Sequence, residues 1–466
     1  MLIPDGAPGL VTKFPDEILS CPRCQSSIES DGKRAYACPH CGHVMPVLGD
    51  VPWIHHLPEA SLWQWRNALG AELDRLRAQQ EKCVAATKNP AIAAATRQRL
   101  LRLAQAYAEQ APCLETLLAP MTRAAPANAP GFADAMATRL PLSQTLSIYA
   151  QTLFRDWAWE TGEADALTRC VRSCIPTEGL GDKLLVLGSG ASRLAWDLHQ
   201  SINSIKSTVA LDHNPLLALA AAKITSGRKV KLHEFPRAPL DHKNSGIMRT
   251  CAAPADTRPG MHFLLADGLN PPLREESVTA VLTPWFIDIV PRDPRLLARS
   301  INRLLANGGV WINSGTHVFE SGDELTRFLP EELREIFAAE GFAIEQESFD
   351  EIVYLKSPAS CHGRLERIWT FRARKVRTVD RPTPHVNVPD WLMDLNKPVP
   401  ELEYFRGMQR QWGLWAELSG QVDGKTSIAE AALNFGKKYG LPDADALGSA
   451  VGFFGQLYEE SRRAGR

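Results

Sequence analysis

The spacing of hydrophobic residues separates the chain into segments of different character. Between about residues 135 and 376, short apolar runs alternate with amphipathic stretches of helical spacing. The runs at 183–187 and 278–290 are rich in Val, Leu and Ile, as buried strands usually are. Alternating strands and helices predict an α/β domain over residues 135–376, with helices on both faces of a mostly parallel, Rossmann-like sheet.

A helical hairpin is predicted ahead of this domain, over residues 58–125. Leu62, Trp65 and Leu69 recur at three- and four-residue spacing, as on one face of a helix. The sequence KNPA interrupts the pattern, and we expect a second helix from about Ile92 to about Gln110, which Pro112 stops or kinks. Proline and alanine after the hairpin predict a linker to the α/β domain.

Length and charge restrict the class of protein. A chain of 466 residues is too long for one hydrophobic core, so we expect two to four domains. Its 52 Lys and Arg balance 53 Asp and Glu, so no overall basic field points to a nucleic-acid partner. The sequence shows no signal-peptide pattern and no apolar run long enough to span a membrane. We therefore expect a cytoplasmic protein with no membrane contact.

Four of the ten cysteines form a metal-binding pattern. They are Cys21, Cys24, Cys38 and Cys41, in the sequences CPRC and CPHC. Two facing Cys-x-x-Cys knuckles present four thiolates to one point, and such a closed tetrahedral set is typical of structural Zn²⁺. We predict a zinc ribbon over residues 15–57 that supports folding and does no chemistry. His40 and His43 lie beside the knuckles, and either could replace a cysteine as ligand.

A glycine-rich turn follows the first predicted strand of the α/β domain. Gly188 and Gly190 lie between this strand and a helix, so backbone N–H groups and the positive helix end approach a bound ligand. The next strand ends in Asp212, which can accept hydrogen bonds from ribose hydroxyls in nucleotides and in S-adenosylmethionine (SAM). The third glycine of the dinucleotide fingerprint would fall at Arg193, and this bulky residue favours SAM, a ligand without phosphates.

Two later strands also carry polar or aromatic residues at their ends. One strand ends at Asp267, which Gly268 follows. The strand at 278–290 carries Trp285, Phe286 and Asp288 at or past its carboxyl edge, where open parallel sheets bind ligands. The segments EIVYLKSP and RIWTFRARK predict an antiparallel hairpin that closes the sheet.

Four stretches of this domain resemble the carnosine N-methyltransferase-like family of class I SAM-dependent methyltransferases. They are LFRDWAWETGEA (153–164), GSGASRLAWDL (188–198), WFIDIV (285–290) and GGVWINSG (308–315). With the helical hairpin, the resemblance covers roughly residues 60–376. It implies a class I methyltransferase sheet and SAM as the cofactor.

The resemblance implies a role for each matched position. Arg155 would contact the carboxylate end of SAM, with the loop of Gly188 and Gly190 beneath it. Asp212 would hold the ribose, and Asp267 with Gly268 the adenine. Asp288 would hold the imidazole of the substrate. His317 is the candidate for a catalytic histidine that the family has shortly after WIN-x-G, although the segment between them is shorter in this chain. A family tyrosine late in the closing hairpin has no counterpart in RIWTFRARK.

The C-terminal part has a different pattern. Residues 377–400 are rich in proline and predict a linker. Residues 401–466 predict a small winged-helix module, with a capped helix from about Ser427 and a break at YGLP. The module is similar to PqqD-like domains, which bind a leader peptide by adding a strand to a sheet edge. A structural or dimerising appendage and a DNA-binding module are the alternatives, and the few clustered basic residues disfavour DNA.

Together these features predict a SAM-dependent N-methyltransferase that methylates the imidazole of a small histidine-containing dipeptide or of a peptide. If Asp288 accepts one ring N–H, it fixes the tautomer and turns the other nitrogen toward the methyl group. The first alternative is O- or N-methylation of a peptide natural product guided by the C-terminal module. The second is a non-catalytic SAM-binding scaffold. The oligomeric state is left open.

Overall fold

The computed structural model describes residues 14–32, 34–131, 134, 138, 145–289, 293–319, 324–380, 396–399, 401 and 403–464. The chain divides into two compact units, Met1–Val388 and Pro389–Arg466. Because most of the predicted linker (381–395) lies outside the described residues, the two units are considered separately.

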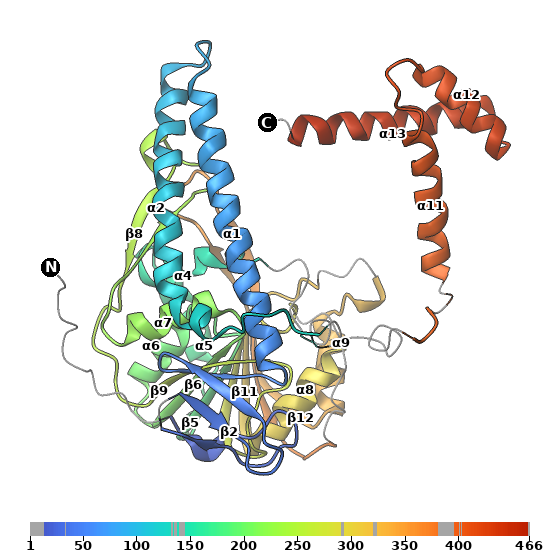
Figure 1. Ribbon diagram of the computed structural model, residues 1–466. Coiled ribbons are helices and arrows are strands. Elements are labelled where there is room, and N and C mark those ends of the chain that lie inside the picture. The colour runs from blue at the N-terminus through green and yellow to red at the C-terminus, as the bar shows by residue number, and fades with distance from the viewer. Residues whose placement is uncertain are drawn as a thin grey trace. The chain divides into compact units, whose positions relative to one another are not determined.

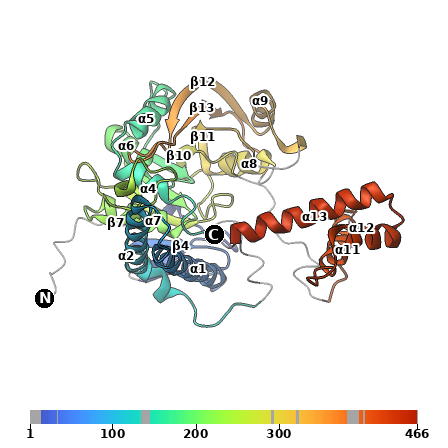
Figure 2. The same cartoon turned by 90° about the horizontal axis from the view of Figure 1, so that it is seen from above.

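A single large sheet forms the centre of the first unit (Figures 1 and 2). Among the described residues it has eleven strands, in the order β1-β2-β3-β4-β9-β6-β5-β10-β11-β13-β12. Their bounds are β1 Glu29–Ser30, β2 Ala35–Ala37, β3 Val44–Leu48, β4 Val51–Ile54, β5 Lys183–Leu187, β6 Ser207–Asp212, β9 Met261–Ala266, β10 Val278–Pro284, β11 Leu305–Gly315, β12 Phe342–Tyr354 and β13 Arg364–Lys375. Strands β7 (Val230–Glu234) and β8 (Ile247–Cys251) form a separate antiparallel pair.

The middle of this sheet is parallel, as predicted. Strands β9, β6, β5, β10 and β11 all run in one direction, and β13 and β12 close the sheet as an antiparallel hairpin. This order and these directions confirm the predicted fold class, a Rossmann-like sheet of the class I methyltransferase type. One boundary was wrong: β10 ends at Pro284 and does not continue to residue 290. The reason is that Trp285 takes a left-handed φ of 44°, which turns the chain out of the sheet.

The cysteine-rich segment is built into the same sheet. Strands β1 to β4 pair antiparallel with one another, and β4 then pairs in parallel with β9. In this register Trp53 lies beside Leu265 and Ile54 beside Ala266. The predicted ribbon is therefore an extension of the main sheet at the β9 side.

Helices cover both faces of the sheet. The buried residues of α4 (Ala150–Trp157), α5 (Glu163–Ser173), α6 (Arg193–Ser201) and α7 (Pro215–Thr225) share one core with Leu184 and Val186 of β5. Those of α8 (Pro294–Leu304) and α9 (Pro330–Ala339) share the opposite core with Leu185 and Leu187. Alternate residues of β5 thus face opposite layers, as a doubly covered sheet requires. The described residues of the unit also form three short 3₁₀ turns: η1 Asp16–Ile18, η2 His242–Asn244 and η3 Glu324–Thr326.

The helical hairpin is present, and its second helix is longer than predicted. Helices α1 (Pro58–Thr87) and α2 (Ala94–Ala124) project as a pair in Figure 1. Of the two effects expected at Pro112, a stop or a kink, the stop was wrong, because Pro112 and Pro120 both lie inside α2. Beyond the first proline, Leu114 and Leu118 are buried in the main core, and this packing favours continuation of the helix over the hydrogen bonds that the prolines remove.

The second unit consists of α11 (Glu403–Ser419), α12 (Ile428–Tyr439) and α13 (Asp443–Ala464) around a small core of Leu418, Phe435 and alanines. Ser427 caps α12 as predicted, with a capping box to Glu430. The described residues of this unit include no strand, so they provide neither the wing nor the sheet edge that a PqqD-like module needs. Within the described part of the chain, no helix is both long and apolar enough to cross a membrane.

Candidate cofactor and substrate site

The glycine-rich turn connects β5 to α6 at the carboxyl edge of the sheet. Gly188 and Gly190 have φ values of 64° and 55°, a conformation that favours glycine. A Cβ at Gly188 would lie 2.4 Å from Cδ2 of Phe286, whereas a Cβ at Gly190 would meet no atom within 4 Å. The turn is thus closed by packing at Gly188 and open at Gly190, which leaves room for a ligand beside Gly190.

Asp212 fixes this turn from the end of β6. Its Oδ2 accepts a hydrogen bond from the Gly190 N–H at 2.7 Å, and its Oδ1 accepts one from the Asn214 N–H at 2.8 Å. Burial raises the pKa of Asp212 to about 6, against the effect of these backbone donors. Each carboxylate oxygen has a second lone pair, so Asp212 can also accept hydrogen bonds from ribose hydroxyls.

Asp267 and Gly268 follow β9 on the other side of β6. Asp267 Oδ1 accepts a hydrogen bond from the Leu269 N–H at 2.9 Å. A Cβ at Gly268 would lie 2.7 Å from Cζ of Phe286. The ring of Phe286 therefore packs against both Gly188 and Gly268, and it joins three of the predicted segments. Residues 188–190, 212–213 and 267–270 are all half-buried, so together they form an accessible surface at this edge.

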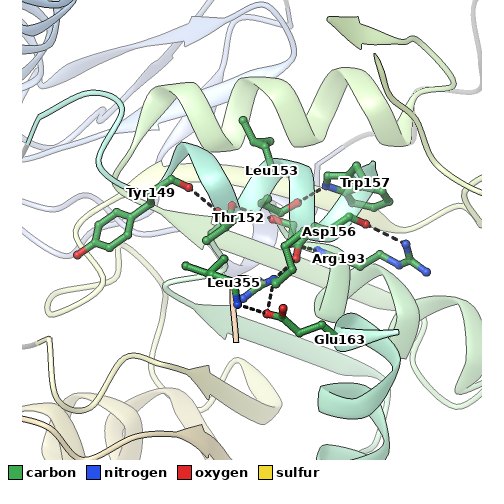
Figure 3. Close-up of polar contacts among 12 residues, drawn as sticks. Tyr149, Thr152, Leu153, Asp156, Trp157, Glu163, Arg193 and Leu355 are labelled. Atoms are coloured by element: carbon green, nitrogen blue, oxygen red, sulfur yellow. Dashed lines mark hydrogen bonds and ion pairs between the residues drawn. The ribbon is translucent and has the colours of Figure 1, made fainter. Parts of the chain in front are cut away.

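Helix α4 is attached to the glycine turn through Asp156 and Trp157 (Figure 3). Asp156 Oδ2 accepts a hydrogen bond from the N–H of Arg193 at 3.3 Å, at the start of α6. The indole N–H of Trp157 donates to the carbonyl of Ala191 at 2.8 Å. The motif LFRDWAWETGEA thus supports the turn physically, a role that its sequence did not reveal.

Arg155 lies within this motif, between carboxylates and aromatic rings. Its Nε is 2.6 Å from Asp156 Oδ1 and 3.9 Å from Glu163 Oε1. The guanidinium carbon lies 5.8 Å from the ring centroid of Trp285 and 5.9 Å from that of Tyr354. Burial alone would lower the pKa of Arg155, but Asp156 and Tyr354 raise it above its ordinary value, so the cation is retained.

Tyr354 was missed by the sequence reasoning, which searched for a tyrosine in the last strand. It is the last residue of β12, in the first strand of the closing hairpin, and its ring lies 4.9 Å from that of Trp285. Burial raises the pKa of Tyr354 to about 12, so its hydroxyl remains protonated. The signal was present in EIVYLKSP, but only the pairing of β12 with β13 shows where this strand ends.

Asp288 lies in the turn beyond β10, and only one of its two carboxylate oxygens has hydrogen-bond partners among the described residues. Its Oδ2 accepts hydrogen bonds from Thr316 Oγ at 2.6 Å and from the Val318 N–H at 3.0 Å. Its Oδ1 is buried and has no hydrogen-bond partner among the described residues. Burial raises the pKa of this carboxyl group, against the effect of the hydrogen bonds from Thr316 and Val318. The Nδ1 atom of His317 is also buried without a partner in the described structure.

The four cysteines of the knuckles come together, as the spacing predicts. Their sulfur atoms all lie within 4.8 Å of one another, with 3.6 Å between Cys21 and Cys41 and 3.4 Å between Cys24 and Cys38. Sulfur ligands at about 2.3 Å from a tetrahedral zinc ion would be separated by about 3.8 Å. The set therefore fits a tetrahedral metal ion. Among the described residues, neither His40 nor His43 belongs to this set, and Nε2 of His43 lies 2.9 Å from the carbonyl oxygen of His55.

Comparisons with known proteins give no family for the chain. No family model matches it, and no curated protein matches its sequence. Solved structures that match include a SAM-dependent methyltransferase from Methanosarcina mazei (14% identity, 42% of this chain, 93% of the other, TM-score 0.29). Another is a SAM-dependent methyltransferase and possible histamine N-methyltransferase from Thermotoga maritima (18% identity, 48% of this chain, 91% of the other, TM-score 0.28). A third is the [4+2]-cyclase SpnF (15% identity, 49% of this chain, 92% of the other, TM-score 0.31). At these TM-scores the fold assignment rests on the strand order given above.

Proposed function

We propose that the chain is a SAM-dependent methyltransferase that methylates an imidazole nitrogen of a histidine-containing dipeptide or peptide. The observation that carries the proposal is the convergence at one sheet edge of the open glycine turn, two strand-end carboxylates and Asp288 with its unpartnered oxygen. The choice of an imidazole as the methylated group rests on Asp288, and the experiment below tests it directly.

The cofactor would lie along the half-buried edge. Asp212 would accept hydrogen bonds from the ribose, and Asp267 would contact the adenine. Asp156 engages Nε of Arg155, which leaves the terminal amino groups of that guanidinium to hold the carboxylate of the cofactor. SAM supplies a methyl group activated on a sulfonium. The protein must therefore orient the nucleophile, exclude water and keep the nucleophile unprotonated.

Asp288 would orient the imidazole. A neutral imidazole has one N–H and one nitrogen with a free lone pair, and its ordinary pKa is about 6.5. An N–H donated to Oδ1 of Asp288 satisfies a buried acceptor that is otherwise unpaired, and it directs the other nitrogen away from the carboxylate. Thr316 and Val318 hold Oδ2 and so fix the carboxylate plane. The aromatic pair Trp285 and Tyr354 would form a wall that excludes water.

The four-cysteine set would hold a structural Zn²⁺ ion. The short distances between the sulfur atoms leave no open coordination position for a substrate. The ion would therefore contribute to folding of the segment that supplies β1 to β4.

The test is mass spectrometry of the full chain incubated with SAM and a panel of histidine dipeptides and short histidine peptides. We expect the gain of one methyl group on an imidazole. Asp267→Ala serves as a binding control, because it should weaken binding of S-adenosylhomocysteine (SAH). If SAH binds but no imidazole gains a methyl group, the substrate assignment is wrong. If neither SAM nor SAH binds, the methyltransferase proposal itself is wrong.

A further inference from the structure

A buried histidine and a half-buried one meet two tryptophans at the adenine end of the proposed cofactor site. The rings of His55 and His213 are 5.7 Å apart and edge to face. The ring centroid of Trp53 lies 4.6 Å from that of His55, and the ring centroid of Trp65 in α1 lies 5.4 Å from that of His213. We call these four residues the histidine–tryptophan cluster. None of the four belongs to a stretch that carries the sequence resemblance.

Both histidines have a nitrogen with no partner. The Nε2 atoms of His55 and His213 are buried, and neither has a hydrogen bond among the described residues. Only 7% of the His55 surface is exposed. Burial lowers the pKa of both histidines, so both imidazoles are neutral. An unsatisfied buried polar group costs about 1–3 kcal/mol, which indicates that a ligand or water completes the cluster.

The position of the cluster identifies the part of the ligand involved. His213 directly follows Asp212, the proposed ribose contact, and is half-buried at the accessible edge. His55 directly follows β4, in which Ile54 pairs with Ala266, so the next residue on each strand is His55 and Asp267. The carboxylate of Asp267 opposes the lowering of the His213 pKa, because it would stabilise a protonated imidazole nearby. The two imidazoles therefore lie beside the proposed ribose and adenine contacts.

The cysteine knuckles hold the His55 backbone directly. Nε2 of His43, two residues after Cys41, is 2.9 Å from the carbonyl oxygen of His55. Nε of Arg23, inside the first knuckle, donates to the carbonyl of His56 at 3.1 Å. Residues in or next to both knuckles thus hold the backbone of the short segment that follows β4.

We infer that the cysteine-rich segment completes the cofactor site: His55, held by the cysteine knuckles, forms the adenine pocket together with His213. This inference rests on the proposed function, because it assumes that SAM binds at this edge. A purine has ring-nitrogen acceptors and an exocyclic amino donor, so a neutral imidazole can pair with it through either a protonated or an unprotonated Nε2. The segment would then act in cofactor recognition as well as in folding.

The first experiment is isothermal titration calorimetry of the full zinc-loaded chain with SAH and with its deaminated counterpart, S-inosylhomocysteine. We expect His55→Phe to weaken SAH binding about tenfold, the value of one hydrogen bond between buried groups, and to reduce the preference for SAH over the inosine compound. His362→Phe, at an exposed histidine outside this segment, is the control, and it should bind SAH as the wild type does. His213→Phe is a second variant, at a half-buried position.

The outcomes separate this inference from the proposed function. If the wild type fails to bind SAH, the proposed function fails. If the wild type binds SAH and both phenylalanine variants bind both compounds as it does, adenine recognition by the histidines is wrong. An equal loss for SAH and the inosine compound would also overturn it, because a purely structural role does not distinguish the two purines.

The link to the metal has its own readout. His43→Phe keeps all four thiolates but removes the bond to the His55 carbonyl, and it should weaken SAH binding with zinc content unchanged. Removal of zinc by EDTA, followed with a zinc-sensitive dye, should weaken SAH binding in the wild type and have little further effect in His55→Phe. Unchanged affinity in both His43→Phe and the zinc-free wild type would overturn the coupling.

Discussion

Gly188 and Gly190 provide a matched pair for testing the glycine turn. Both have positive φ, so an alanine at either position costs about 1–2 kcal/mol of backbone strain. Only at Gly188 would the new Cβ also overlap Phe286, at 2.4 Å from Cδ2. Overpacking of this kind costs about 1–3 kcal/mol. Gly188→Ala should therefore destabilise the first unit by about 2–5 kcal/mol, and Gly190→Ala by about 1–2 kcal/mol.

The assay is thermal unfolding followed by circular dichroism, together with SAH titration. One kcal/mol corresponds to about 2 °C for a unit of this size, so we expect Tm to fall by about 4–10 °C for Gly188→Ala and about 2–4 °C for Gly190→Ala. For SAH affinity we expect the opposite order, with the larger loss in Gly190→Ala, because its new methyl group enters the open space beside the proposed cofactor. Gly190→Ala should lose at least about tenfold in SAH affinity while it remains folded.

A double variant isolates the contact with Phe286. In a Phe286→Leu background, Gly188→Ala should cost only the backbone strain, since the ring that it strikes has gone. The reasoning is refuted if Gly188→Ala melts within about 2 °C of the wild type, or if both alanine variants lose equal stability. It is also refuted if Phe286→Leu brings no relief.

Three further predictions concern charge and metal. The pKa of Asp212 is raised to about 6, and ribose hydroxyls would stabilise its charged form, so SAH affinity should rise with pH up to about 6 and level off above it. Asp212→Asn should remove this dependence, and a wild-type affinity that stays flat below pH 6 would contradict the assignment. Asp288→Asn keeps an acceptor for Thr316 and Val318 but replaces the unpartnered oxygen by an amide donor. The value of kcat/KM for an imidazole substrate should therefore fall about 10–100-fold, with SAH affinity unchanged. Equal turnover would exclude the imidazole role. Cys38→Ser should lose zinc and have a lower Tm. Cys361→Ser, at an exposed cysteine outside the knuckles, should change neither zinc content nor Tm. Full zinc content in Cys38→Ser would show that the four thiolates do not share one ion.

The local features of this protein could be predicted from its sequence because they depend on neighbours in the chain. Apolar runs bounded by glycine and acidic residues indicated β5, β6 and β9 to within a residue, and the Cys-x-x-Cys spacing brings thiolates together within each knuckle. The capping box at Ser427 is likewise complete within four residues.

What depended on contacts between distant segments was decided only by the tertiary structure. The pairing of β4 with β9 places Ile54, the residue before His55, beside Ala266, the residue before Asp267 and more than two hundred residues away in the chain, and no local pattern encodes such a pair. Burial of Leu114 and Leu118 kept α2 helical beyond Pro112, against the local preference of proline. Tyr354 reaches Arg155 only because β12 pairs antiparallel with β13 and ends at the carboxyl edge of the parallel strands. In each case the free energy of long-range packing, which a single sequence does not display, determined which side chains meet.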